Sequence, residues 1–200
     1  MRAEEVGPHG PDSAVHDAFF ARTAREVARE LIGWMLLVDG VGGIVVEAEA
    51  YEPDDPASHS FAGRTRRNAT MFGPPGHLYV YRSYGIHWCA NVVCAEDGVG
   101  AAVLLRALEP TAGLEVMRAR RGLDDVRLLA AGPGRLTEAL AVTDAHDGLD
   151  LRRPPFALEP PAAPVDVVAS PRVGITRAAE EPWRYSLAGS SFVSRPRPRA

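Results

Sequence analysis

An aromatic hairpin pattern over residues 78–92 constrains the fold most strongly. Two apolar runs rich in aromatic residues flank the turn Ser83-Tyr84-Gly85, and this arrangement is typical of a β-hairpin. The tip of such a turn normally carries small polar residues, so Tyr84 is unusual there. An exposed ring of this size is stabilised by packing against a partner, and a stacked base is one such partner.

The composition is that of one globular domain. The chain has 200 residues, of which 46% are hydrophobic, enough for a proper core. It contains no apolar run of about 18 residues and no apolar signal segment near Met1, so we expect a cytoplasmic protein without a membrane span. The two cysteines, Cys89 and Cys94, form no disulfide framework.

The charged residues restrict both binding and chemistry. The net charge of −4 argues against a broad basic surface, so any contact with nucleic acid must come from local patches. All 22 basic residues are arginine, which binds phosphate in a planar, bidentate manner. A GC-rich genome is the simpler cause of this bias. Because the chain has no lysine, no side-chain amine can form a Schiff base.

Hydrophobic spacing and turn residues predict the remaining elements. Helices are expected over residues 17–31, 111–121 (with Thr111 as N-cap) and 132–142. Strands are expected over residues 34–38, 44–51, 101–108, 165–169, 172–175 and 185–193. The long irregular segment 52–76 is of a kind that is often functional, and residues 153–164 read as a proline-rich surface connection. We expect a loose leader over 1–15, one domain over 16–195 and a frayed tail over 196–200.

The strand at 44–51 alternates in polarity. One face is predicted to carry Ile44, Val46, Ala48 and Ala50, and the other Val45, Glu47, Glu49 and Tyr51. Two carboxylates roughly 7 Å apart on one face suit an acid and a base that hydrolyse a glycosidic bond. The plainer alternative is a solvated polar face. Tyr51 extends this face and His59 follows it, which favours a convergence of proton-handling groups.

Other polar residues are less specific on their own. His59, His77, His87, Cys89 and Cys94 lack a recognised metal-ligand spacing, so we expect no catalytic metal. Arginines at positions 64, 66 and 67 form a basic cluster that suits either solvent or phosphate.

Three further features allow both a functional and a structural interpretation. The helix start at 132–135, which ends in Arg135, offers backbone N–H groups and a guanidinium to a phosphate. Arg106, inside an apolar strand, needs a carboxylate partner and is either structural or lines a site. Asn91 lies on a strand where it can present its amide to a pocket, whereas the strand tyrosines Tyr79 and Tyr81 suit either stacking or core packing.

Taken together, these motifs resemble one family, the alkyladenine or 3-methyladenine DNA glycosylases. The resemblance covers nearly everything except both tails. It is densest in five segments, which are Val46-Glu47-Ala48-Glu49-Ala50-Tyr51, Ala57-Ser58-His59-Ser60, Arg67-Asn68-Ala69-Thr70-Met71-Phe72, Gly76-His77-Leu78-Tyr79-Val80-Tyr81 and Val103-Leu104-Leu105-Arg106-Ala107-Leu108-Glu109-Pro110. It continues through Gly132-Pro133, Arg172-Val173-Gly174-Ile175 and Gly189-Ser190.

The resemblance implies a role for individual residues. Glu49 matches the carboxylate that activates the attacking water, and Arg106 a group near the bound nucleotide. The residues matching the pocket for the extruded base are Tyr51, His59, Tyr81, Asn91 and Leu104, with Tyr81 stacking on the base and Asn91 excluding guanine. Tyr84 matches the wedge that fills the gap in the duplex. Arg135 sits where a basic residue is placed to meet phosphate, and we expect the same contact from Arg66 and Arg67 of the basic cluster. Glu47 does not match a catalytic acid in this family.

The resemblance also implies a fold and an activity. The fold is a single α+β domain with a curved, mainly antiparallel sheet, a protruding β-hairpin and flanking helices. The activity is that of a monofunctional DNA glycosylase, a hydrolase of N-glycosyl bonds that flips and excises alkylated or deaminated purines of the 3-methyladenine and hypoxanthine type in base excision repair. It uses no cofactor and acts as a monomer on damaged double-stranded DNA at the bacterial nucleoid. Alternatives are a non-catalytic lesion-binding module and a two-carboxylate hydrolase of small glycosides. Residues 85–90 depart from the family pattern, and the acidic Glu52, Asp54 and Asp55 are unexpected beside phosphate.

Overall fold

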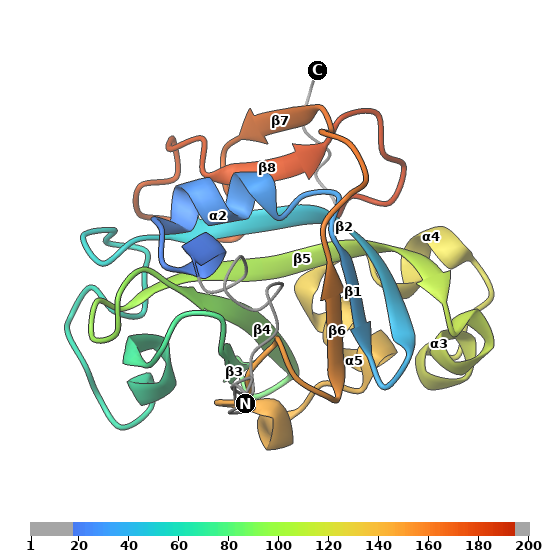
Figure 1. The fold of residues 1–200 in the computed structure, drawn as a ribbon, viewed down its shortest axis with the longest axis horizontal. Coiled ribbons are helices and arrows are strands. Elements are labelled where there is room, and N and C mark those ends of the chain that lie inside the picture. The colour runs from blue at the N-terminus through green and yellow to red at the C-terminus, as the bar shows by residue number, and fades with distance from the viewer. Residues whose placement is uncertain (1–17, 195–200) are drawn as a thin grey trace, which may run out of the picture.

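The computed structural model describes residues 18–194 and confirms an α+β fold built on one curved antiparallel sheet (Figure 1). The expected leader and tail lie outside the described residues. The strands are β1 (Met35–Val38), β2 (Val41–Tyr51), β3 (Leu78–Ser83), β4 (His87–Cys94), β5 (Ala101–Ala112), β6 (Phe156–Glu159), β7 (Val167–Ser170) and β8 (Arg184–Leu187). Their order is β3-β4-β5-β2-β1-β6, and β8 joins β2 and carries β7.

Strand β2 organises the sheet because it pairs along both edges. One edge follows β5 for almost its whole length. The other edge pairs with β1 over its first residues and with β8 over Glu47–Glu49. In Figure 1, β1 and β6 run in a different direction from β7 and β8, although both pairs of strands lie on this same edge of β2. The two ends of β2 therefore belong to differently oriented parts of the sheet, which gives it its curvature.

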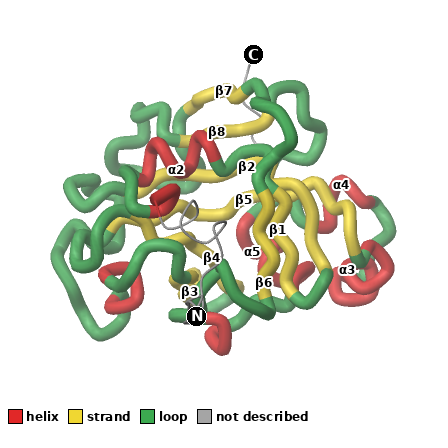
Figure 2. Tube along the Cα trace, viewed as in Figure 1, coloured by secondary structure: helices red, strands yellow, loops and turns green. Residues whose placement is uncertain are grey.

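Short helices surround the sheet, as Figure 2 shows. They are α2 (Ala24–Glu30), α3 (Leu114–Arg121), α4 (Val126–Leu129), α5 (Pro133–Leu140) and the 3-10 turns η1 (Ala69–Phe72) and η2 (Asp144–His146). None of the helices in residues 18–194 has the length and apolar character needed to span a bilayer.

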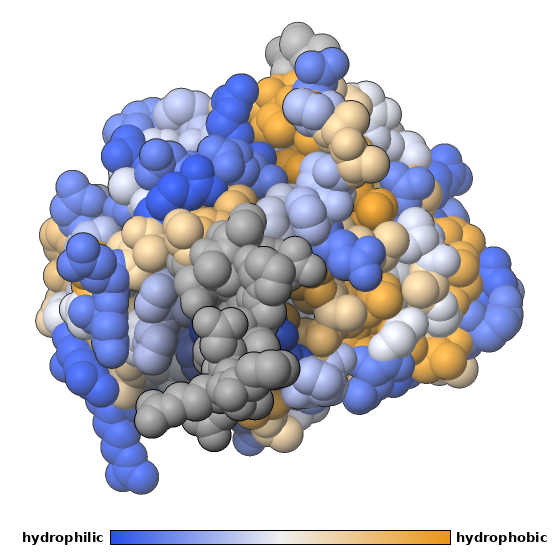
Figure 3. Space-filling view, viewed as in Figure 1, coloured by the Kyte–Doolittle hydropathy of each residue, from blue (hydrophilic) through white to orange (hydrophobic). Residues whose placement is uncertain are grey.

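The helix expected over 17–31 is interrupted within the described residues. Residues 21–23 form a turn, and α2 starts afresh after Thr23. Thr23 and Glu26 make a reciprocal capping box that satisfies backbone donors at this start. α2 buries Ala24, Val27 and Ala28, while its charged face is exposed and appears as hydrophilic surface in Figure 3.

The predicted alternation along β2 is wrong before Glu47. The register with β5 shifts between Val45 and Glu47 and again before Ala48, which marks a β-bulge. Val45 therefore packs in the main core with Ala48 and Ala50, whereas Val46 packs in a separate small cluster with Ala107 and Val193. Beyond the bulge, Glu47, Glu49 and Tyr51 share one face, as predicted.

Three other expectations about elements are corrected. Thr111 is not an N-cap, because pairing with β2 extends β5 to Ala112 and Gly113 precedes α3 instead. The connection at 153–164 contains β6, which pairs with β1. Residues 172–175 form no strand, and the backbone N–H of Val173 donates to the Glu49 carboxylate rather than to a neighbouring strand.

Candidate functional site

A cavity of about 680 Å³ lies where the hairpin, the irregular segment, β5 and the start of α5 meet. Its volume is in the usual range for a small-molecule or nucleotide site. The structure brings together at this cavity most of the residues predicted from the sequence, namely Tyr51, His59, Arg67, Tyr81, Tyr84, Asn91, Leu104 and Arg106. Further lining residues, to which the family resemblance assigned no role, include Met71, Ser83, His87, Cys89, Pro133 and Val173.

The sheet register sets the floor of this cavity. Across four adjacent strands, Tyr79 lies opposite Asn91, Asn91 opposite Leu104, and Leu104 opposite Glu49. Such a row projects side chains to one face of a sheet. Asn91 Nδ2 donates to the Tyr79 carbonyl at 3.1 Å, which fixes the plane of the amide. The row thus places an amide and a leucine between the aromatic residues and the carboxylate.

Three rings form the aromatic wall. The rings of His59 and Tyr81 meet edge to face with their centroids 4.5 Å apart, and those of Tyr79 and Tyr81 lie 5.5 Å apart. His59 Nδ1 is 3.1 Å from the Tyr79 hydroxyl. Burial, followed by the charge of Arg67, lowers the pKa of His59, so its imidazole is neutral at pH 7. Burial raises the pKa of Tyr79 to about 12, so its hydroxyl remains protonated.

The irregular segment is held in place by Asn68. Its Nδ2 donates to the backbone carbonyls of His59 and Gly63, at 2.8 and 3.1 Å, and its Oδ1 accepts from Thr65. A buried amide that uses both ends in this way fixes the backbone around it. The segment is thus ordered without regular secondary structure, and His59 is presented to the cavity.

Glu49 is fully buried directly behind the cavity wall. Its carboxylate contacts three groups that line the cavity. Oε1 accepts from Val173 N at 2.7 Å, and Oε2 accepts from the Tyr51 hydroxyl at 3.0 Å and lies 3.2 Å from Arg106 Nη1. Burial and the neighbouring carboxylate of Glu49 raise the pKa of Tyr51 far above its ordinary value, so this phenol stays a donor. A carboxylate has about four acceptor positions, so these contacts leave room for one water.

Glu47 has a different environment, although it shares the strand face with Glu49. It accepts from Arg106 Nε at 2.8 Å, Arg184 Nε at 2.7 Å, and the backbone and hydroxyl of Ser194 at 2.5 and 2.8 Å. Burial works to raise the pKa of Glu47, but the two arginines and Ser194 lower it below its usual value. Glu47 lines neither of the two cavities described here. Its acceptor positions are filled by these four donors, so unlike Glu49 it has none left for a water, which disfavours the two-carboxylate alternative.

The hairpin tip has the character predicted for it. Tyr84 is 90% exposed and adopts a φ of 50°, followed by Gly85 at 70°. Positive φ at both central residues of a turn is strained for a tyrosine, and strain of this kind concentrates at functional sites. Next to the hairpin turn, a Cβ on Gly134 would lie 2.6 Å from the His87 ring, so only glycine lets α5 pack this closely.

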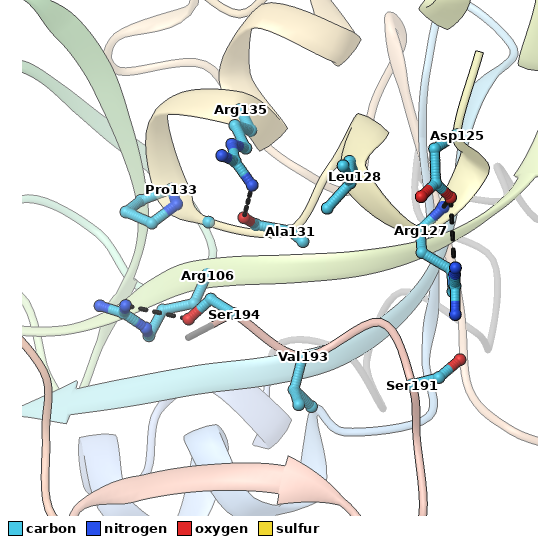
Figure 4. A pocket seen from close by; sticks show the side chains of 11 residues that line it. Arg106, Asp125, Arg127, Leu128, Ala131, Pro133, Arg135, Ser191, Val193 and Ser194 are labelled. Atoms are coloured by element: carbon cyan, nitrogen blue, oxygen red, sulfur yellow. Dashed lines mark hydrogen bonds and ion pairs between the residues drawn. The ribbon is translucent and has the colours of Figure 1, made fainter. Parts of the chain in front are cut away.

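The predicted phosphate-binding arginines do not all gather at the cavity. Arg67 lines it, whereas Arg66 does not. Arg135 instead lines a second cavity of about 440 Å³, together with Arg127 (Figure 4). Arg106 and Pro133 line both cavities, so the two adjoin.

Two of the three acidic residues after Tyr51, Glu52 and Asp55, have structural partners. Glu52 pairs with Arg25 at 3.3 Å, and Asp55 pairs with Arg172 where both side chains are fully buried. The Arg172 guanidinium also donates to the Ala50 carbonyl at 3.0 Å. These two carboxylates are therefore neutralised within the fold and do not oppose a phosphate backbone. The Arg172 pair also fixes the backbone of Val173, whose N–H reaches Glu49.

Several known proteins resemble this chain in sequence along almost its whole length. The family model of methylpurine-DNA glycosylases matches residues 18–191. A relative from Rhodopseudomonas palustris strain HaA2 is 62% identical over 196 residues, covering 98% of this chain and 96% of that protein. A relative from Nitrosospira multiformis is 60% identical and covers 88% of this chain and 92% of its own length. A relative from Granulibacter bethesdensis is 59% identical and covers 91% of this chain and 88% of its own length. All three carry the provisional name of a 3-methyladenine DNA glycosylase. This chain belongs to the methylpurine-DNA glycosylase family.

Proposed function

We propose that this DNA glycosylase excises alkylated and deaminated purines of the 3-methyladenine and hypoxanthine type, with Glu49 as the base that activates water. The observation that carries the proposal is the placement of a buried carboxylate directly behind an aromatic cavity large enough for a nucleotide. A base inside a duplex is out of reach of such a site, so the nucleotide must first leave the stack.

The reaction balances with groups that the site supplies. The C1′–N bond breaks and its electron pair leaves with the base. The water oxygen bonds to C1′, and its proton passes to Glu49 Oε1, the oxygen that keeps a free acceptor position. Arg106 Nη1 and the Tyr51 hydroxyl hold that carboxylate in place. The negative charge of Glu49 stabilises the oxocarbenium character that develops at the sugar.

Substrate selection depends on the cavity walls. A cationic alkylated base is already a good leaving group and stacks favourably on Tyr81. The fixed amide of Asn91 would clash with the exocyclic amine of guanine, and Leu104 closes the floor beside it. Hypoxanthine is neutral and needs protonation to leave, so its release should depend more strongly on low pH than that of 3-methyladenine.

Phosphate contacts come from the arginines around both cavities. We assign Arg67 to the first cavity, Arg135 to the second and Arg66 to the adjacent surface, consistent with arginine's bidentate recognition of phosphate. Within residues 18–194 the exposed Arg135 side chain on α5 makes one long hydrogen bond, 3.5 Å, to the Ala131 carbonyl (Figure 4). It is therefore available to a DNA strand. The enzyme acts as a monomer in the cytoplasm, on DNA of the nucleoid.

Replacing Tyr84 by alanine should weaken binding to duplex DNA that contains an abasic-site analogue. Loss of one stacking ring costs about 1–3 kcal/mol, or roughly 5- to 160-fold in Kd, and should lower the flipping equilibrium of a fluorescent purine. Phe61→Ala removes another exposed aromatic residue that does not line the cavity and is the matched control. Equal binding and flipping by the Tyr84 variant and the wild type would refute the wedge.

One gel assay tests the proposed reaction. Duplexes that contain inosine or alkylated purines are incubated with the protein and split into samples with and without hot alkali. We expect release of the free base and strand breaks only after alkali, because the chain has no lysine to form a Schiff base. Lesion binding without base release would favour a non-catalytic module. Strand breaks without alkali would contradict the monofunctional reaction.

A further inference from the structure

The reaction proposed above leaves Glu47 without a role, although it is one of the most elaborately bonded side chains in residues 18–194. It is fully buried, it lies between the two register shifts in β2, and it lines neither cavity. A buried charge is costly unless it is fully paired, and replacement by packed apolar residues is often no less stable. The placement of this charge two residues from Glu49 therefore points to a purpose other than stability.

Arg106 connects the two carboxylates. Its guanidinium divides its donors among three acceptors. Nε donates to Glu47 Oε1 at 2.8 Å, Nη2 donates to Ser194 Oγ at 3.1 Å, and Nη1 faces Glu49 Oε2 at 3.2 Å. Figure 4 shows Arg106 on β5 directed to Ser194. Because Nε and Nη2 are engaged in this way, the guanidinium faces Glu49 with one nitrogen, Nη1, rather than with two nitrogens as in a bidentate pair.

Glu47 is itself held from the C-terminal side of the fold. Arg184, on β8, donates its Nε to the same oxygen that Arg106 uses, and Ser194 donates its backbone N–H to the other oxygen. Ser194 Oγ adds a further bond to Glu47 at 2.8 Å. The carboxylate cannot rotate without breaking several of these bonds, so the orientation of Arg106 is fixed as well.

We propose that Glu47, itself held by Ser194 and Arg184, is a positioning residue that orients Arg106 so that the guanidinium meets Glu49 through Nη1 alone. This inference rests on the proposed role of Glu49 as the base. A single contact keeps Arg106 from covering the carboxylate and leaves an acceptor position for the attacking water. A bidentate Arg106 would occupy both oxygens and stabilise the ionised form too strongly for a base.

The charges around Glu49 determine the expected direction of a pH effect. The ionisable groups that act on it are Tyr51 from the same strand, Arg106 from β5, Arg172 from the loop before Val173, and Tyr81 and Cys89 from the hairpin. Burial keeps the hydroxyl of Tyr81 and the thiol of Cys89 neutral, because it raises the pKa of each group. When Glu47 is made neutral, Arg106 is attracted to Glu49 alone, so the site around Glu49 becomes more positive and the acid limb of the rate profile should move to lower pH.

The test is Glu47→Gln, which keeps the size of the side chain and removes its charge. Single-turnover release of hypoxanthine should fall roughly 10- to 100-fold, part of the 10²–10⁴-fold that a general base supplies, and the acid limb of the rate profile should move to lower pH. Binding to an abasic-site analogue should change less than about twofold. Glu52→Gln is the matched control, because it neutralises another buried, paired carboxylate without contact to Arg106 and should leave the rate and the acid limb unchanged.

A second variant covers the case in which Glu47→Gln does not fold. Ser194→Ala removes one donor to Glu47 and the acceptor of Arg106 Nη2, but it keeps the backbone N–H bond. We expect a several-fold slower release and an acid limb shifted in the same direction. A folded Glu47 or Ser194 variant with the wild-type rate and an unmoved acid limb would overturn the proposal, since a merely structural role changes only the fraction of folded enzyme.

A crystal structure of Glu47→Gln provides a measurement that does not require activity. We expect the Arg106 guanidinium to turn and pair with both oxygens of Glu49. An Arg106 that keeps its wild-type orientation would contradict the positioning role even if the wild-type enzyme released no base. Failure of the wild type to release base would instead contradict the proposed function, so the two failures are distinguishable.

Discussion

Glu49→Gln abolishes release of 3-methyladenine from alkylated duplex DNA, with a fall in the single-turnover rate of at least roughly 10²–10⁴-fold. The amide keeps the size of the carboxylate but can neither accept the proton of water nor stabilise the cationic sugar. Binding to an abasic-site analogue should remain within a few-fold of wild type, because Glu49 lies behind the cavity wall and the aromatic wall is unchanged. A single-turnover assay of base release measures the rate, and a titration with the abasic-site analogue measures the affinity.

A control variant shows whether the loss of base release is specific to Glu49. Glu52→Gln removes a buried, paired carboxylate three residues further along the chain and should release the base at the wild-type rate. Retention of full turnover by the Glu49 variant would eliminate the proposed base. Equal loss in both variants would indicate damage to the fold.

Arg172→Met should lower the free energy of unfolding by about 3–5 kcal/mol, because it leaves the fully buried Asp55 without its partner. The same change removes a donor to the Ala50 carbonyl and the stacking of the guanidinium between Tyr51 and Trp183, whose ring centroids lie 4.7 and 4.9 Å away. Denaturant titration measures the stability. Base release should also slow in the folded variant, because the Val173 N–H is no longer held against Glu49.

The ion pair between Arg25 and Glu52, which is half exposed on the arginine side, is the control for this loss of stability. Arg25→Met breaks the pair with Glu52, in which the Arg25 side chain is 51% exposed, and it should cost less than about 1 kcal/mol. A loss of less than 1 kcal/mol in the Arg172 variant would show that the buried pair does not hold the segment before Val173.

The sequence predicted the parts of the site that lie on regular strands. The aromatic hairpin, the strand with Glu47, Glu49 and Tyr51 on one face, and the buried Arg106 all follow from local pattern. The sheet register then brings Asn91 and Leu104 into line with Glu49. The resemblance to a known family identified which of the two carboxylates is the base, because alternation alone treats Glu47 and Glu49 alike.

Other features depend on contacts that are distant in sequence, and no local pattern indicates them. The bulge that puts Val45 and Val46 on unexpected faces becomes visible only when β2 pairs with β5. The buried pair of Asp55 and Arg172 spans 117 residues, so the sequence shows only an acidic loop and an isolated arginine. The β6 strand lies in a proline-rich segment and is stabilised by the edge of β1 rather than by its own propensity.

The most direct test of the account is a crystal structure of Glu49→Gln bound to duplex DNA that contains inosine, in which the uncleaved nucleotide is trapped outside the helix. We predict that the hypoxanthine packs against Tyr81 and that an ordered water lies within hydrogen-bond distance of residue 49 and faces C1′. An extruded sugar whose C1′ lies far from residue 49, with no space for water between them, would contradict it.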